Sequence, residues 1–160
     1  MPQAQRFYTI HKKDPKGGYY SHAMIYSPCV LLIRNDDGEW VEPLEVDVLT
    51  SAAVNAGLVR KKALEKDPEV TEEVKIGNVM KERMARLLYL FEKRGVKNVV
   101  LGSFGTGVFQ NDVSVVASHW AELINVPGSR FQNSFERVVF AVLGKKTFEE
   151  FKQAFEGRQV

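Results

Sequence analysis

The stretch that decides the fold is Leu101-Gly102-Ser103-Phe104-Gly105-Thr106-Gly107-Val108-Phe109-Gln110-Asn111-Asp112. It follows the apolar run Val99 to Leu101 and precedes an amphipathic segment near Asp112, an order that predicts strand, loop and helix. Its three glycines within six residues allow backbone conformations that a side chain forbids, and close approach of the backbone to a ligand. Successive loop N–H groups and the N-terminus of the next helix then form a site for anions, above all phosphate.

The glycine spacing leaves two interpretations open. It is G-x-x-G-x-G, which is neither the dinucleotide fingerprint nor a Walker loop, because no Gly-Lys-Ser/Thr follows. On the glycines alone, a tight turn between a strand and a helix is as good an interpretation as a phosphate loop. Phe104 and Phe109 favour a ligand site, since a solvent-side loop gains little from large rings that neither pack nor stack.

Length and composition predict one soluble globular domain over residues 1–160. A net charge of +2 is too small to imply a nucleic-acid surface, and no apolar run approaches the roughly 20 residues that cross a bilayer. The single cysteine, Cys29, excludes an internal disulfide and fits a reducing compartment, so we expect a cytoplasmic protein, or a nuclear one in a eukaryote. We expect Cys29 to be buried among apolar residues, and no metal or cofactor is expected, because the histidines lack ligand spacing.

The first third of the chain is expected to form strands and turns. Asn35-Asp36-Asp37-Gly38 is the strongest turn signal and predicts a hairpin. Apolar runs predict short strands at Tyr8–Ile10, Met24–Tyr26, Val30–Ile33, Trp40–Val41 and Val46–Leu49. The last of these strands leads into a run of mostly small residues, Thr50 to Gly57.

Helices are expected to alternate with strands in the rest of the chain. Asp67 and Pro68 suit a helix start, and the helix is expected to stop at Gly95. Its apolar face is predicted at Met80, Met84, Leu87, Leu88 and Phe91.

Asp112 is expected to cap the next helix, and Thr147 to Glu150 reads as the capping box of the last helix. Strands are predicted at Val96–Leu101 and Val138–Leu143, with Val99 to Leu101 buried on both sides.

This order of elements favours an α/β fold of three layers, α/β/α, with a mixed, mostly parallel sheet flanked by helices. Ligands of such folds lie at the carboxyl ends of strands. Two small-residue loops are predicted at such ends, Thr50 to Gly57 and Gly102 to Phe109. If their strands lie side by side, both loops face one cleft, which is the physical argument for a nucleotide-like ligand.

Several segments resemble one family when they are taken in order. They are Tyr26-Ser27-Pro28, Arg34 to Gly38, Glu45 to Ala56, Leu101 to Asp112 and Val139 to Val142. Their order and spacing look like the C-terminal two-thirds of the microbial-type poly(ADP-ribose) glycohydrolases, a branch of the macrodomain fold. The resemblance covers most of residues 7 to 143 and implies a macrodomain-like fold that binds ADP-ribose or ADP-ribosylated protein.

The resemblance also implies a ligand site. In that family the glycine-rich loop wraps the diphosphate and distal ribose of ADP-ribose, so backbone N–H groups from Gly102 to Gly107 are expected to face the phosphates. Ser103, Phe104 and Thr106 replace the family's usual Ala, Trp and Cys. Val108 and Phe109 close the motif, and Phe109 either lies near the ligand or packs in the core. Ala53 and Asn55 would line the same cleft, with a helix cap or turn as the equal alternative for Asn55.

Catalysis is not carried over by the resemblance. In the family it depends on an upstream Gly-Gly-Gly loop and a Gln-Glu-Glu motif, and both precede the region that this chain matches. The Glu72-Glu73 and Glu149-Glu150 pairs lie near expected helix starts, where the helix dipole explains them, so the catalytic residues stay unknown. The chain is thus expected to be a fragment whose catalytic half lies elsewhere, or a reduced protein that binds without cutting.

Three functions therefore remain in view: binding of ADP-ribose, hydrolysis with a non-standard acid or a partner chain, and a structural role without ligand. A second copy of the chain could cover an exposed sheet edge and form a homodimer. We also expect Gly105→Val to abolish ligand binding and leave the fold largely intact, because a β-branched side chain would block approach to phosphate.

Overall fold

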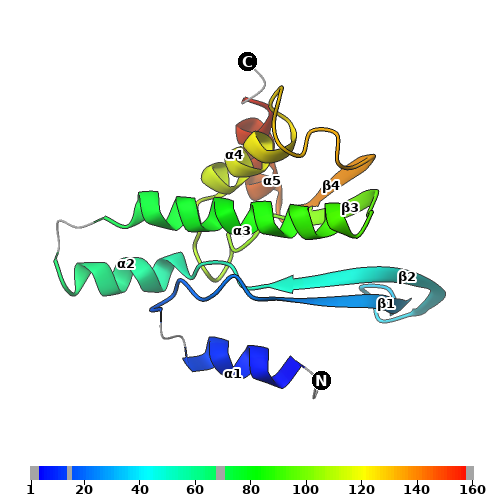
Figure 1. Ribbon diagram of the computed structural model, residues 1–160, viewed down its shortest axis with the longest axis horizontal. Coiled ribbons are helices and arrows are strands. Elements are labelled where there is room, and N and C mark those ends of the chain that lie inside the picture. Colours follow the sequence, from blue (N-terminus) through cyan, green and yellow to red (C-terminus); the bar gives the residue numbers. More distant parts are fainter. Residues whose placement is uncertain (1–3, 14–15, 68–70, 158–160) are drawn as a thin grey trace.

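The computed structural model describes residues 4–13, 16–67 and 71–157 (Figure 1). Helices and strands follow one another in the order α1 (Gln5–Lys13), β1 (Met24–Arg34), β2 (Trp40–Ser51), α2 (Ala56–Leu64), α3 (Glu73–Lys93), β3 (Asn98–Gly102), α4 (Val113–Ile124), β4 (Arg137–Ala141) and α5 (Lys145–Glu156).

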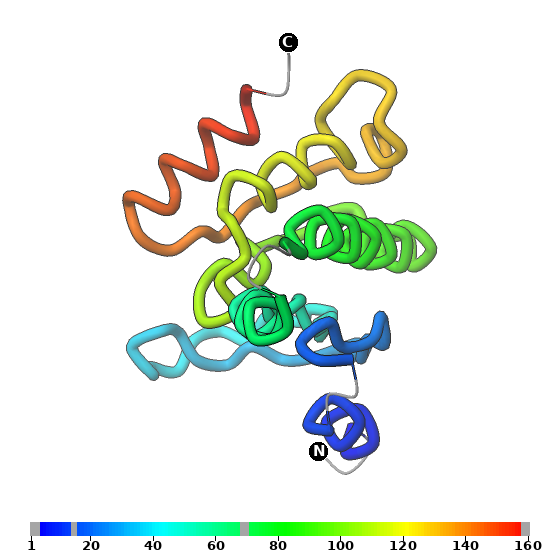
Figure 2. Tube along the Cα trace, turned by 90° about the vertical axis from the view of Figure 1, so that its left-hand side faces the viewer, coloured from blue at the N-terminus to red at the C-terminus, as the bar shows by residue number. Residues whose placement is uncertain are grey.

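The N-terminal element is a helix, so the strand predicted at Tyr8–Ile10 is wrong. These residues belong to α1, in which Thr9 Oγ1 donates to the Gln5 carbonyl at 2.8 Å. A run of three apolar residues is too short to separate a strand from one face of a helix. The helix α1 lies on the side of the β1–β2 hairpin that faces away from α3 (Figures 1 and 2).

The predicted short strands merge into one long hairpin. β1 and β2 pair antiparallel around the confirmed turn, where Asn35 Oδ1 accepts the Glu39 N–H at 2.9 Å and Gly38 has φ 81°. The register shifts between Ser27 and Val30, and the Cys29 N–H at this bulge donates to Asp47 Oδ1 at 3.0 Å.

The cysteine at the bulge is exposed, so the expected burial of Cys29 is wrong. At the bulge, Cys29 has a φ of 55° and its side chain does not enter the core. The neighbouring Glu45 carboxylate is the main cause that raises the pKa of its thiol, which disfavours the reactive thiolate.

The predicted apolar face of α3 is confirmed, since its five members are all buried. The helix ends before Gly95, whose φ of 70° requires glycine. Its N-cap is Glu72, not Asp67, and Pro68 lies outside the described residues.

The predicted cap of α4 is also confirmed, because Asp112 Oδ1 accepts the Val115 N–H at 2.9 Å. The capping box at Thr147 is wrong: α5 begins earlier, with Gly144 as its N-cap at φ 83°. Gly144 caps α5 without a side-chain hydrogen bond, in a conformation that favours glycine. Thr147 therefore lies inside the first turn of the helix and is not its cap.

The described strands form two separate pairs. β1 and β2 are antiparallel, and β3 and β4 are parallel, with Val100 opposite Val139. Val99 and Leu101 are buried but Val100 is 71% exposed, so the prediction that this strand is covered on both sides is wrong. The fold is mixed α/β, with small sheets in place of the one mostly parallel sheet that the sequence predicted.

The core lies between α3, α4 and β3, with Trp120, Met84 and Leu88 almost fully buried. α5 packs on this core at the end of the molecule opposite α1 (Figure 2). Among the described residues, no helix combines the length and the hydrophobicity that crossing a membrane requires.

Candidate functional site

Two loops far apart in the sequence meet at the carboxyl ends of β2 and β3. Asn111 is only 5% exposed, and its Nδ2 donates to the carbonyls of Val54 at 2.7 Å and Gly105 at 2.9 Å. The Gly57 N–H donates to the Phe109 carbonyl at 3.2 Å and adds a second link. The small-residue loop after β2 and the glycine loop after β3 therefore form one structure, although their strands do not pair.

Gly105 holds these two loops together by its lack of a side chain. A Cβ at this position would lie 2.5 Å from Ala53 Cβ and 2.7 Å from Asn111 Nδ2, and the residue has φ 77°. Both facts exclude a branched side chain. The expectation that Gly105→Val leaves the fold largely intact is wrong, because valine there would separate the loops.

Gly107 differs from Gly105 in its backbone conformation and in the space around it. It has no positive φ, and a Cβ there would meet no atom within 4 Å. Within the described part of the chain, the N–H groups of Gly105, Gly107 and Val108 donate no hydrogen bond. Val108 is 91% exposed, so this turn presents backbone donors to solvent.

A cavity of about 530 Å³ lies beside the glycine loop. It is open to solvent and is lined by α1, the segment before β1, the end of β2 and the two loops. Its described lining consists of Phe7, Tyr8, His11, Lys12, Tyr20, Thr50, Ser51, Ala52, Ala53, Phe104, Gly105 and Phe109. Most of this lining is aromatic or small, and none of these residues is a carboxylate. Such a wall suits a flat ring system with a phosphate nearby.

Aromatic rings follow one side of the cavity. The rings of Tyr20 and Phe109 have centroids 5.8 Å apart, and those of His11 and Tyr20 are 5.7 Å apart. His11 Nε2 lies 3.3 Å from Ser21 Oγ, which ties α1 to the segment before β1. These rings therefore give the cavity an apolar side, and Gly105 of the glycine loop also lines it.

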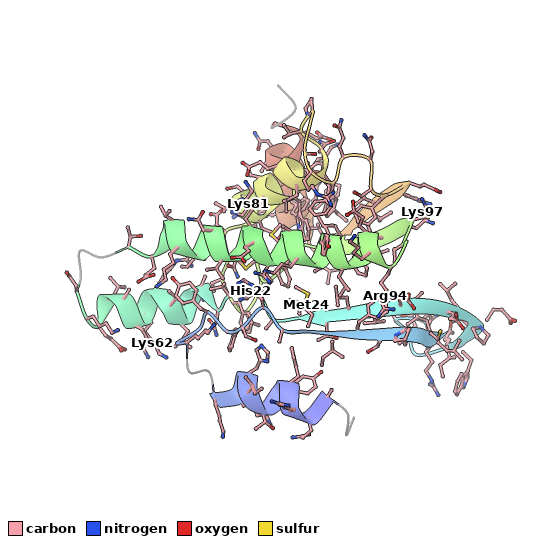
Figure 3. All side chains as sticks on the ribbon, in the orientation of Figure 1. His22, Met24, Lys62, Lys81, Arg94 and Lys97 are labelled. Carbon is pink, nitrogen blue, oxygen red and sulfur yellow. The ribbon has the colours of Figure 1, made fainter. Side chains whose placement is uncertain are left out.

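Arg83 supports the site from α3. It is fully buried, and its guanidinium donates to the carbonyls of Ala52 at 2.7 Å and Tyr19 at 2.8 Å. Its Nε lies 3.4 Å from Nδ1 of His22, which sits between α3 and the start of β1 (Figure 3). Burial lowers the pKa of Arg83 to about 10, so the side chain stays charged at neutral pH.

The acidic pair at the start of α3 is engaged in structural contacts. Tyr19 Oη donates to Glu72 Oε2 at 2.6 Å, and this hydrogen bond is the main cause that lowers the pKa of Glu72. Arg60 Nε donates to Glu73 Oε1 at 2.6 Å and, through Nη1, to the Gln110 carbonyl at 2.7 Å. Arg60 lowers the pKa of Glu73, so neither carboxyl is poised as an acid at neutral pH.

The sequence-predicted residues divide between the cavity wall and the loop frame. Ala53, Phe104, Gly105 and Phe109 line the cavity. Ser103 and Thr106 hydrogen-bond each other at 2.9 Å within the turn, and Gly102 ends β3. Asn55 is a helix cap, since its Oδ1 accepts the Leu58 N–H at 3.0 Å.

The part of the wall that α1 supplies was not predicted from the sequence. Phe7 and His11 are four residues apart, the spacing of one helix face, and this signal was hidden by the strand predicted there. Arg83 was missed as well, although it falls three residues after Met80 and four before Leu87, on the buried face of α3. Among the described residues, no group of three or more histidine, cysteine or acidic side chains could hold a metal ion.

Solved structures similar to this chain include poly(ADP-ribose) glycohydrolases of two bacteria. The poly(ADP-ribose) glycohydrolase of Deinococcus radiodurans, solved in complex with ADP-ribose, is 32% identical and matches 99% of this chain with a TM-score of 0.83. The Thermomonospora curvata enzyme is 35% identical over 97% of this chain, with a TM-score of 0.78. The chain is similar to these microbial poly(ADP-ribose) glycohydrolases in both sequence and fold, which supports a PARG-like macrodomain family.

The chain spans less than two thirds of these relatives: it covers 62% of the D. radiodurans enzyme and 53% of the T. curvata enzyme. No protein-family profile and no curated protein matches the chain. The likeness therefore rests on solved structures, at an identity high enough to relate the sequences as well as the fold.

Proposed function

We propose that the chain binds ADP-ribose, free or attached to protein, in the cavity between α1, the end of β2 and the glycine loop. The observation that carries the proposal is the pairing of an aromatic wall with a turn of unused backbone donors. A diphosphate would accept hydrogen bonds from the turn around Gly107, and a base or ribose would lie against Phe109 and Tyr20. The D. radiodurans relative was solved with ADP-ribose bound, which supports this choice of ligand.

The first test is a calorimetric titration of the chain with ADP-ribose, with AMP as the control ligand. AMP carries the base and one phosphate but lacks the diphosphate and the distal ribose. If the proposal holds, ADP-ribose binds more tightly than AMP. Equal or absent binding of both ligands would leave the family fold in place and remove the proposed ligand.

Gly107→Val is the variant that tests the turn. Open space and an ordinary φ at Gly107 mean that valine leaves the fold intact, whereas its branched side chain would stand where the phosphate approaches. We expect ADP-ribose affinity to fall at least about tenfold, or roughly 1.4 kcal/mol, with an unchanged melting temperature. Gly107→Ala is the graded control and should weaken binding less.

Hydrolysis is the second candidate, because the relatives are glycohydrolases. It needs a carboxylic acid near the distal ribose, and the described cavity lining contains none. Binding without cleavage is therefore the better-supported function of residues 1–160. A glycohydrolase assay on poly(ADP-ribose) with the calorimetry sample tests this: cleavage would mean that an acid reaches the site from outside the described lining.

A further inference from the structure

The glycine loop ends at a residue with unusual backbone geometry. Gln110 has a φ of 55°, a left-handed conformation that residues other than glycine seldom adopt. It lies between Phe109, which lines the proposed ligand cavity, and Asn111, which is buried and joins the two loops. Backbone strain of this kind persists only where the surrounding contacts hold it in place. The contacts that hold Gln110 therefore bear on the shape of the cavity wall.

Arg60 of α2 holds the backbone of this residue. Its Nη1 donates to the Gln110 carbonyl at 2.7 Å. The Gln110 N–H donates to the Gly107 carbonyl at 2.9 Å. The Gln110 side chain lies against Gly57 of α2, where an added Cβ would stand 2.4 Å from Oε1. Gln110 is thus held through its carbonyl, its N–H and its side chain, by α2 as well as by the glycine loop.

Glu73, at the start of α3, fixes the direction of the Arg60 guanidinium. Arg60 Nε donates to Glu73 Oε1 at 2.6 Å, and Nη2 donates to Glu73 Oε2 at 2.9 Å. A bidentate pair of this kind sets the plane of the guanidinium as well as its position. The remaining Nη1 is then directed at the Gln110 carbonyl, a geometry that the single nitrogen of a lysine cannot reproduce. The residues Arg60, Glu73 and Gln110 are called the loop clamp below.

The loop clamp faces a different cavity from the one proposed for ADP-ribose. This cavity, of about 540 Å³, is lined by Gly57, Arg60, Lys61, Leu64, Glu65 and Gln110. None of these residues belongs to the described lining of the proposed ligand cavity. Arg60 can therefore act on a ligand there only through the glycine loop or through its charge, and the two routes can be separated by experiment.

We propose that Arg60 and Glu73 are positioning residues, which hold Gln110 in its left-handed conformation and so place the turn around Gly107 and the ring of Phe109 for ADP-ribose. This inference rests on the proposed function. Without the clamp, Gln110 relaxes to an ordinary negative φ, and the direction of the chain changes on both sides of it. The cavity wall at Phe109 moves as a result, although no clamp residue touches the ligand.

Amide hydrogen exchange of the chain without ligand tests the clamp by itself. In Arg60→Met, we expect the N–H groups of Gln110 and Asn111, which both donate within the loop, to exchange at least about fivefold faster. Arg130→Met is the matched control, because Arg130 makes a bidentate pair with Glu92 near the other end of α3, at 2.9 and 2.7 Å. It should leave exchange in the glycine loop unchanged. Unchanged exchange at Gln110 and Asn111 in Arg60→Met, or the same increase in both variants, overturns the proposal.

Calorimetric titration with ADP-ribose separates geometry from charge. Arg60→Lys keeps the positive charge but cannot reach both partners, so we expect affinity to fall at least about threefold. Glu73→Met removes a negative charge, which by charge alone would strengthen binding of an anionic ligand. Because the guanidinium then loses its direction, we expect affinity to fall at least about threefold here too. Full affinity in Arg60→Lys, or unchanged or higher affinity in Glu73→Met, overturns the positioning role.

The unaltered chain distinguishes failure of this inference from failure of the proposed function. If the unaltered chain binds ADP-ribose and the clamp variants bind it equally well, the function stands and the clamp has no part in it. If the unaltered chain does not bind ADP-ribose, the proposed function fails. Hydrogen exchange at Gln110 and Asn111 then still decides whether Arg60 holds the loop.

Discussion

The two ends of β2 are held in different ways. At its carboxyl end the chain passes into Ala52 and Val54, whose carbonyls accept hydrogen bonds from the buried Arg83 and Asn111. At its other end, Trp40 is 69% exposed and Leu44 is 60% exposed, and the strand is held by its pairing with β1. One strand thus runs from a tightly fixed site to a loosely covered hairpin (Figure 1).

This difference shows that the buried polar contacts of β2 lie at its carboxyl end. The bonds that fix the end of β2 come from α3 and from the glycine loop, which are distant in sequence and define the wall of the cavity. When a buried carbonyl loses its hydrogen-bond donor, the folded state is destabilised, because water cannot take the place of that donor. We therefore expect single substitutions to reduce stability strongly at the site and only slightly at the hairpin.

The largest loss of stability is expected for Arg83→Met. Methionine fills a similar volume but leaves the Ala52 and Tyr19 carbonyls without their buried donor. At about 1–3 kcal/mol for each of the two unsatisfied acceptors, we expect a loss of about 2–6 kcal/mol, measured by urea unfolding. ADP-ribose binding should weaken as well, since Tyr20 and Ala52 line the cavity.

Arg86→Met is the matched control for this substitution. Arg86 lies one turn farther along α3, its side chain is 56% exposed, and it pairs with Glu82 on the same helix. Exposed pairs of this spacing contribute about 0.3–0.5 kcal/mol. A loss for Arg83→Met no larger than that of Arg86→Met would show that the buried bonds do not fix this end of β2.

A smaller loss is expected for Asn111→Ala. The amide joins the two loops through the carbonyls of Val54 and Gly105. Alanine leaves the Val54 carbonyl without this donor, whereas the Gly105 carbonyl keeps the backbone N–H of residue 111. We expect about 1–3 kcal/mol of lost stability, together with faster hydrogen exchange in the glycine loop. Asn78→Ala, at an exposed position on α3, should change stability by less than about 0.5 kcal/mol. Equal effects of the two substitutions would contradict a bridging role for Asn111.

Phe109→Ala tests the aromatic wall through affinity. Phe109 lines the cavity next to Tyr20, and stacking of a base on an aromatic ring contributes about 1–3 kcal/mol. ADP-ribose affinity measured by calorimetry should fall accordingly. Phe148→Ala, on the exposed side of α5, removes a ring of the same size far from the cavity and should leave affinity unchanged. Unchanged affinity in both variants would mean that Phe109 has only a packing role.

The sequence was sufficient wherever one local signal decides the structure. The hairpin turn at Asn35 to Gly38, the apolar face of α3 and the Asp112 cap depend on nearby residues, and all three are confirmed. The same is true of the strand, glycine loop and helix over residues 98–124.

The sequence was insufficient where a contact between residues far apart in the chain decides the structure. Gly105 was predicted to contact phosphate. Its packing against Ala53, about fifty positions earlier, could not be predicted from the residues next to it in the sequence. Arg83 was not singled out from the sequence, because its acceptors lie in two other segments. Val100 was expected to be covered because its apolar neighbours are, whereas the two sheets remain apart beside it.

Leu44→Ser at the hairpin is expected to have the smallest effect. Leu44 is 60% exposed and lies opposite Leu32, which is itself 47% exposed, so serine removes little buried apolar area. We expect a change of less than about 0.5 kcal/mol in the unfolding free energy. A loss as large as that of Asn111→Ala would mean that the hairpin is covered in the isolated chain, and the contrast between the two ends of β2 would fail.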